Sequence, residues 1–335
     1  MGAVTIMSPE TEEIGSQKNN SEGTRDVSCL AERLMSLPEQ IETALQPVRE
    51  YTPAEKVCIF GLGDSSIPGE ILTNYAEEYC SQYVLTMSDG RIPGWVDRTT
   101  YVILCSYSGD TPEILNVYDE AKHKDHRIHC ITSGGHLLQC CQADGTPIST
   151  VPANLQSREA TGYLIGTLAA VLEGIGIGHP ATYLRSLLPQ IRGFRDRLYS
   201  NESYLSTLTN LMSGKVMAIY STSKLRGAAK RWKLAMNKNV RNLAFCGELP
   251  EFDHNEIVGW SDSNHCAKDL TLVILLTHCE SKIMLHIVKS MIEVLENNGR
   301  KVVTIDLDGD DSTLNNIYGI MLGDALSVRL SENLS

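Results

Sequence analysis

The sequence lacks the features that mark membrane proteins, disulfide scaffolds and nucleic-acid-binding proteins. No apolar run approaches the roughly 18 residues of a membrane span, and the N-terminus does not read as a signal peptide. The ten cysteines include no C-x-x-C pair, and the histidines show no metal-ligand spacing. Basic residues are few, 29 against 41 acidic ones, which leaves a formal charge of -12. We therefore expect a cytoplasmic protein with reduced thiols, no metal or cofactor, and no nucleic-acid or membrane partner.

The composition is typical of a folded soluble protein. Hydrophobic residues make up 42% and charged residues 21% of the 335 positions. This length suffices for one large or two ordinary domains. Residues 1–25 are polar and aperiodic, so we expect them to form a disordered N-terminal arm.

Short β-rich runs alternate with helical patterns along the rest of the chain. In the first half, KVCIFGLG, TYVILCSYS and RIHCITS are separated by the helical patterns SIPGEILTNYAEEYC and TPEILNVYDEAKHK. A mainly helical stretch covers residues 158–212, after which KVMAIYSTS, DLTLVILLT and KVVTIDL repeat the order. The alternation predicts an α/β protein with two tandem doubly wound parallel sheets linked by helices. The two subdomains are expected at residues 26–178 and 179–335.

The segment VILCSYSGDTPEIL joins a predicted strand to a predicted helix through small and hydroxylated residues. Ser106, Ser108 and Thr111 offer hydroxyl groups, Gly109 lets the backbone approach a ligand, and Pro112 suits a first helical turn. N–H groups at a helix N-terminus attract anions without the help of a lysine. A simple helix cap without a ligand would show the same residue types.

A second loop favours an anion site over a simple cap. FGLGDSSIPGEIL places Ser65 at the preceding strand-to-helix turn. Because the carboxyl ends of neighbouring parallel strands open onto one crevice, both turns would face the same ligand. The G-x-G of this loop lacks the third glycine of a dinucleotide fingerprint. The two loops together therefore predict a phosphate site.

Six segments of the chain carry a family resemblance. They are GLGDSSIPGEIL, SYSGDTPEIL, ITSGGHL, QSREATGYLIG, RWKLAMNKN and PEFDHNEIVGW. Their order and spacing resemble the bifunctional phosphoglucose/phosphomannose isomerases, which are members of the sugar isomerase (SIS) domain superfamily. The likeness covers residues 30–329. The motif SYSG-x-T marks only the superfamily, whereas PExxHNEIVGW is more specific to this branch.

The resemblance implies two SIS-type subdomains, a homodimer, and metal-free interconversion of glucose 6-phosphate or mannose 6-phosphate with fructose 6-phosphate. Arg158 matches the family arginine beside the reacting carbons. His254 matches the histidine that opens the sugar ring and is contributed across the dimer interface. The residues that match the family's phosphate-binding positions are Ser65, Ser106, Ser108 and Thr111.

The chemistry of such an isomerisation suits these residue types. A neutral imidazole can move the proton between O5 and O1 that opens the ring. A fixed cation can stabilise the enediolate through which a proton moves between C2 and C1. Without the resemblance, Arg158 would be interpreted as a surface charge and His254 as an ordinary exposed histidine.

The sequence departs from the family at the proton-carrying base. The family has a glutamate sixteen positions before the histidine, where this chain has Lys238. An ammonium group cannot take a proton from carbon, so we expect Lys238 to pair with an acid or bind ligand oxygen. Glu248 is the substitute carboxylate that we infer, because Glu251 matches a glutamate that the family also has. Asp64 replaces a family glycine and adds negative charge beside the expected phosphate.

Two hypotheses remain open. The first is an aldose-ketose isomerase that uses His254 and Arg158, with Lys238 or Glu248 in the place of the family glutamate. The second is a catalytically impaired SIS protein that binds sugar phosphates and acts as a sensor or partner.

Overall fold

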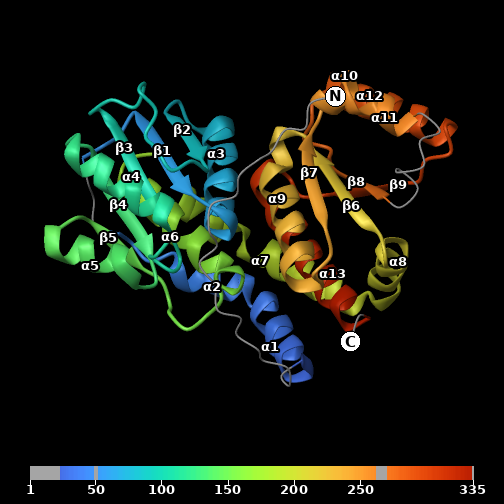
Figure 1. Cartoon of the computed structure of the whole chain (residues 1–335), viewed down its shortest axis with the longest axis horizontal. Coiled ribbons are helices and arrows are strands. Elements are labelled where there is room, and N and C mark those ends of the chain that lie inside the picture. The colour runs from blue at the N-terminus through green and yellow to red at the C-terminus, as the bar shows by residue number, and fades with distance from the viewer. Residues whose placement is uncertain (1–22, 49–51, 262–269, 334–335) are drawn as a thin grey trace, which may run out of the picture.

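Two α/β units flank a central group of helices in the computed structural model, which describes residues 23–48, 52–261 and 270–333 (Figure 1). Of the expected arm, residues 1–22 lie outside the described residues. Residues 23–25 are instead the start of α1 (Gly23–Met35), so the predicted boundary at residue 25 is wrong by three positions. Leu30 and Leu34 of this helix pack on Val328 near the C-terminus. The helix extends beyond this apolar stripe, which is why its first turn was not predicted.

The first sheet contains the strands predicted in the first half of the chain. Its order is β2-β1-β3-β4-β5, and every neighbouring pair is parallel. The strands are β1 (Lys56–Gly61), β2 (Tyr83–Met87), β3 (Thr100–Cys105), β4 (Arg127–Thr132) and β5 (Ile148–Thr150). The helices that follow β1, β3 and β4 are α3 (Ile67–Tyr79), α4 (Pro112–His123) and α5 (Gly135–Asp144).

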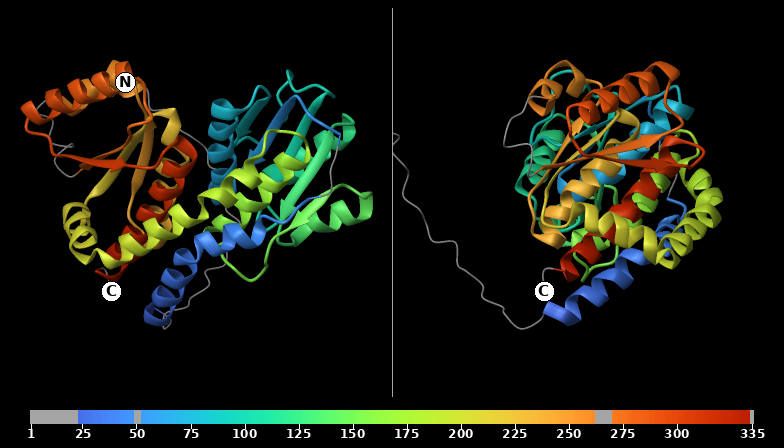
Figure 2. Two further views of the ribbon diagram at one scale, coloured as in Figure 1. Left: turned by 180° about the vertical axis from the view of Figure 1, so that it is seen from behind. Right: turned by 90° about the vertical axis from the view of Figure 1, so that its right-hand side faces the viewer.

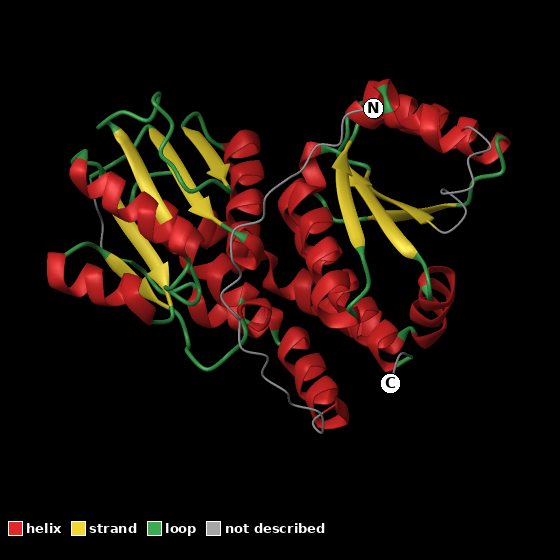
Figure 3. Ribbon diagram, in the orientation of Figure 1, coloured by secondary structure: helices red, strands yellow, loops and turns green. Residues whose placement is uncertain are grey.

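The second sheet repeats this arrangement with one strand fewer. Its order β7-β6-β8-β9 corresponds to β2-β1-β3-β4, and its neighbouring pairs are again parallel. The strands are β6 (Val216–Ser221), β7 (Ala244–Glu248), β8 (Leu270–Thr277) and β9 (Val302–Leu307). Helices α9 (Arg226–Ala235), α12 (Lys282–Asn297) and α13 (Ser312–Glu332) pack around it (Figure 3). The predicted α/β class with two doubly wound parallel sheets is confirmed.

Both sheets bury one face against the same central core. The helices between them include α2 (Leu37–Ala44), α6 (Thr161–Gly174) and α7 (Pro180–Ser200), and Figure 2 shows α7 running from one unit to the other. In β1, Val57 and Ile59 join this core. In β8, Val273 and Leu275 do so as well. The intervening residues of both strands face separate clusters on the outer sides of the sheets, as expected for parallel strands covered on both faces.

Candidate active site

The two predicted phosphate loops lie together at the carboxyl ends of β1 and β3. The short helix η1 (Gly63–Ser66) follows β1, and the Tyr107 N–H donates a hydrogen bond to Ser65 Oγ at 3.1 Å. Within the second loop, Ser106 Oγ lies 2.9 Å from Thr111 Oγ1. Ser108 is exposed, and its hydroxyl accepts a bond from the Asp110 N–H at 3.2 Å. The structure thus ties the first loop to the second through the Ser65–Tyr107 bond, and within the second loop it joins the Ser106 and Thr111 hydroxyls.

The hydroxyl of Thr111 is not a simple helix cap. Thr111 precedes α4 with extended backbone angles, yet its side chain accepts no hydrogen bond from the N–H groups of that helix. It bonds to Ser106 instead. A twelve-residue helix therefore points an N-terminus without a side-chain cap at the loop, which is the arrangement that attracts anions.

Gly109 fixes the shape of the second loop. Its φ of +74° lies in the left-handed region, and a Cβ at this position would lie 1.9 Å from the carbonyl oxygen of Gly134. That close approach exists because the Leu137 N–H donates to the Gly109 carbonyl at 2.9 Å. A larger residue cannot occupy this position unless the backbone at Gly109 or at Gly134 moves.

Four charged side chains form a cluster beside the first loop, which we call the charge cluster: Asp64, Arg231, Lys238 and Asp324. Arg231 on α9 donates to Asp64 Oδ1 and to Asp324 Oδ1, both at 2.8 Å. Lys238 Nζ lies 2.6 Å from Asp64 Oδ2, which also accepts a bond from Ser157 Oγ at 2.9 Å. The cluster joins η1 of the first unit to α9 and α13 of the second.

The Asp64 side chain bonds to none of the hydroxyls that the sequence predicts to bind phosphate. Its side chain is fully buried, and its partners are Arg231, Lys238 and Ser157. Burial alone would raise the pKa of this carboxyl, but the charges of Arg231 and Lys238 and the hydrogen bonds outweigh burial, so that the pKa lies below its ordinary value. The negative charge that the sequence predicted beside the phosphate is therefore compensated within the protein.

Lys238 lies on an unusual turn of helix. Residues Met236–Val240 continue α9 as a π-helix, which ends at Arg241 with a φ of +55°. Such π-turns are rare and are frequent at functional sites. The turn carries the Lys238 side chain to the first unit, where Asp64 is the acid partner expected from the sequence.

Arg158 lies next to the charge cluster on the short helix η2 (Ser157–Glu159). The Gln156 N–H donates to Glu159 Oε2 at 2.8 Å, and this capping box fixes the turn. The Arg158 carbonyl accepts a bond from Arg231 Nη2 at 2.8 Å. Its own Nε is buried and has no hydrogen-bond partner among the described residues. A buried cationic donor without a partner fits a group that meets a ligand.

Glu248 and His254 lie outside this hydrogen-bonded set. Glu248 ends β7, is half exposed, and lies 2.7 Å from Arg226 Nε. His254 is an exposed residue of α10 (Glu251–His254), while Phe252 of the same turn is buried against Tyr220. The structure thus gathers the phosphate residues, Arg158 and Lys238, but leaves Glu248 and His254 on the second unit.

Arg231, Asp324 and Ser157 are site residues that the sequence did not reveal. Arg231 lies in the motif RWKLAMNKN, which carried the family resemblance, but its burial was not predicted. The available signal was Asp324, a charge within the largely buried helix α13, since such a charge requires a partner. Arg231 carried no such signal, because α9 contains three other basic residues. Asp324 lies 93 residues from Arg231, so spacing alone could not identify the pair.

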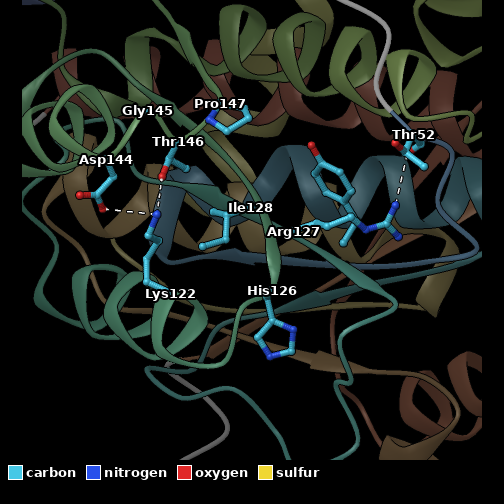
Figure 4. A pocket seen from close by; sticks show the side chains of 10 residues that line it. Thr52, Lys122, His126, Arg127, Ile128, Asp144, Gly145, Thr146 and Pro147 are labelled. Carbon is cyan, nitrogen blue, oxygen red and sulfur yellow. Dashed lines mark hydrogen bonds and ion pairs between the residues drawn. The ribbon is translucent and has the colours of Figure 1, made fainter.

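A separate hollow lies at the opposite edge of the first sheet (Figure 4). Lys122, His126 and Arg127 line it near the amino end of β4. Lys122 Nζ lies 3.6 Å from Asp144 Oδ2, and Arg127 donates to the Thr52 carbonyl at 3.4 Å. Because ligands of such sheets bind at the carboxyl ends of the strands, this hollow is not the candidate active site.

Comparison with known proteins supports the predicted fold and the family resemblance. Residues 201–334 match the family model described as the bacterial phospho-glucose isomerase C-terminal SIS domain. A bifunctional phosphoglucose/phosphomannose isomerase from Caldicellulosiruptor bescii is 29% identical over 316 residues, covering 90% of this chain and 92% of that protein. A D-glucosamine-6-phosphate 4-epimerase from Sulfolobus acidocaldarius is 32% identical over 61% of this chain and 63% of that protein. The solved C-terminal domain of glucosamine-fructose-6-phosphate aminotransferase from Francisella tularensis shares the fold, with a TM-score of 0.70 at 14% identity over 91% of this chain and 96% of that domain.

The two parallel sheets, with the serine-lined loops at the carboxyl ends of β1 and β3 in the first, define an SIS-type α/β protein with two sheets. Within that class, the chain is similar over about nine-tenths of its length to bifunctional phosphoglucose/phosphomannose isomerases, the relatives that the six motifs predicted. In the part of the chain that the structure describes, no helix is long and apolar enough to span a bilayer.

Proposed function

We propose that the protein is an aldose-ketose isomerase that interconverts glucose 6-phosphate or mannose 6-phosphate with fructose 6-phosphate in the cytoplasm. The observation that carries the proposal is the joined set of hydroxyls at the α4 N-terminus, where Thr111 bonds Ser106 rather than the helix. Ser65, Ser106, Ser108 and Thr111 would bind the phosphate. The names of the relatives that align over nine-tenths of the chain support the same substrate class.

Arg158 would stabilise the enediolate. Its Nε is buried without a hydrogen-bond partner among the described residues, and a ligand oxygen would supply one. In the reaction, the base removes the C2 proton of the open-chain aldose, the C–H electron pair forms the C1=C2 bond, and O1 becomes anionic. A proton then passes from O2 to O1, the C1=C2 electron pair takes up the carried proton at C1, and the O2 electron pair forms the C2=O bond of the ketose.

His254 would open the ring from the neighbouring subunit of a homodimer. In the single chain its side chain is exposed on the second unit. Val258, on the adjoining helix α11 (Glu256–Ser261), is 70% exposed. Apolar side chains of this kind are typical of a surface that a partner subunit covers.

Two residues remain candidates for the proton carrier. Lys238 must lose a proton before it can accept one, and its ammonium donates to Asp64. Glu248 is a carboxylate, but it must leave Arg226 to act. The ion pair of Lys238 favours a second candidate function, in which the protein binds the sugar phosphate without turning it over.

Incubation of purified protein with fructose 6-phosphate distinguishes these functions. Formation of glucose 6-phosphate and mannose 6-phosphate is followed by NMR for the native chain and for Lys238→Glu, Glu248→Gln and His254→Ala. We expect native turnover, and a loss of about 10²- to 10⁴-fold on removal of the true base. If only Lys238→Glu is active, the enzyme proposal fails, while the binding function and the family architecture survive.

A further inference from the structure

Lys238 is the one member of the charge cluster that reaches solvent. Its side chain is 40% exposed, whereas those of Asp64, Arg231 and Asp324 are between 0% and 2% exposed. Only Lys238 can therefore touch a ligand. The other members of the cluster can act on a ligand only through it.

Asp64 determines where the Lys238 ammonium lies. A lysine side chain has a flexible stem of four carbons, so a free ammonium group samples many positions. Here the Nζ is held 2.6 Å from Asp64 Oδ2. Asp64 cannot follow the ammonium outward, because Arg231 holds its Oδ1 and Ser157 holds its Oδ2. The fixed carboxylate of Asp64 thus holds the end of a flexible side chain in one position.

This carboxylate lies between the phosphate loop and Arg158. Asp64 immediately precedes Ser65, and its partner Ser157 immediately precedes Arg158. The Lys238 Nζ is therefore hydrogen-bonded to Asp64, the residue that connects the first phosphate loop with the turn that carries Arg158. A phosphate ester bound at the serine-lined loops, with its reacting carbons at Arg158, would have its sugar oxygens beside this ammonium.

We propose that Lys238 binds the sugar oxygens of the hexose phosphate and that Asp64 is the positioning residue that holds its ammonium there. This inference rests on the proposed hexose phosphate site and specifies how that site recognises the sugar. The two carboxylates and two cations of the charge cluster sum to zero net charge. The ammonium therefore adds no long-range attraction for phosphate and acts only on oxygens that reach it.

Binding measurements on the full chain test the inference. Affinities for fructose 6-phosphate and for inorganic phosphate are measured by titration calorimetry for the native protein, Lys238→Met, Lys238→Arg, Asp64→Asn and Asp64→Asn/Lys238→Met. We expect Lys238→Met to weaken fructose 6-phosphate binding about tenfold or more and phosphate binding less than about twofold. Lys238→Arg should recover most of the loss. The double variant should bind no more weakly than Lys238→Met, because Asp64 acts through Lys238.

Lys230→Met is the matched control. Lys230 lies on α9, is 33% exposed, and is ion-paired to the buried Glu70. This variant should leave both affinities unchanged. If Asp64→Asn fails to fold, the comparison of Lys238→Met, Lys238→Arg and Lys230→Met still decides the matter.

Equal weakening of both ligands by Lys238→Met, or no weakening of either, would overturn the inference. Failure of the native protein to bind fructose 6-phosphate would overturn it together with the proposed function. If Lys238→Met weakens the binding of fructose 6-phosphate but not of inorganic phosphate, and the native protein shows no isomerisation, the inference is supported and only the enzyme proposal is refuted.

Discussion

The carboxyl ends of the two sheets, which we call the first and the second crevice after the place where ligands of such sheets bind, satisfy their polar groups differently. In the first unit, the Thr111 hydroxyl leaves α4 uncapped and bonds Ser106. In the second unit, Ser281 caps α12 by accepting the Met284 N–H at 3.2 Å, and Thr222 Oγ1 donates to Glu280. The second crevice is thus satisfied by its own chain. A repeated fold does not repeat a binding site, because an anion needs donors that the protein has not already used.

The largest expected effect is that of Gly109→Ala in the first crevice. The new Cβ would meet the Gly134 carbonyl oxygen at 1.9 Å in a backbone with a φ of +74°. We expect a loss of about 3 kcal/mol or more in the free energy of unfolding, measured by urea denaturation, and loss of phosphate binding. Gly214→Ala is the control, since its φ is +67° but no atom lies within 4 Å of the new Cβ. It should cost about 1 kcal/mol; equal losses in both variants would remove the special role of the first loop.

Acid should weaken the first unit more than the second. His129, in β4, is buried, and burial lowers its pKa from 6.5 to about 4. Below pH 6.5 the unfolded chain binds a proton that the folded chain does not, so stability should fall by about 3 kcal/mol as the pH approaches 4. Asp64, with its lowered pKa, contributes only below its ordinary value of 3.8.

Urea unfolding at about pH 7 and about pH 4.5 measures this pH dependence. His129→Gln should flatten it. His286→Gln, an exposed site on α12 of the second unit, should leave it unchanged. A native slope that His129→Gln does not alter would contradict the assignment.

Removing single hydroxyls should separate the two crevices by ligand affinity. Ser106→Ala takes away a hydroxyl that lies within the joined set of the first crevice. We expect its affinity for inorganic phosphate to fall about tenfold in calorimetry, the usual value of one hydrogen bond to a charged group. Thr222→Ala removes a hydroxyl donor of the second crevice and should change this affinity less than about twofold. A loss in Thr222→Ala as large as in Ser106→Ala would place the phosphate elsewhere.

The smallest effect is expected for Glu280→Gln. The amide can still accept the Thr222 hydroxyl, so stability should change by less than about 1 kcal/mol. The number of phosphates bound per chain should stay the same as in the native protein. An additional binding event would show that the Glu280 charge alone keeps the second crevice closed to anions.

The sequence predicted the central strands better than the edges of the sheets. Runs such as those of β1 and β3 are continuously apolar because both of their faces are buried. The edge strands β2 and β7 were missed, since Tyr83 and Phe245 are exposed at 77% and 56% and Gly247 interrupts the pattern. Half-exposed edge strands carry a weak apolar signal.

The candidate site was predictable only where it is local in the chain. Ser106, Ser108 and Thr111 lie within one loop, so the strand-loop-helix pattern revealed them together. Asp64 and Lys238 are separated by 174 residues in the sequence, and hydrophobic periodicity cannot predict contacts between residues so far apart in the chain. The sequence indicated that Lys238 required an acid, but the folded chain was needed to identify it.

The shared central core has a consequence for how this protein can change over time. A strand of each sheet rests on the same buried layer, and Arg231 of the second half needs a carboxylate from the first. We expect neither half to survive as an autonomous fragment, and substitutions at positions 64 and 238 to be tolerated best when they arise jointly. Natural selection is therefore expected to act on both halves together, even though each half repeats the strand order of the other.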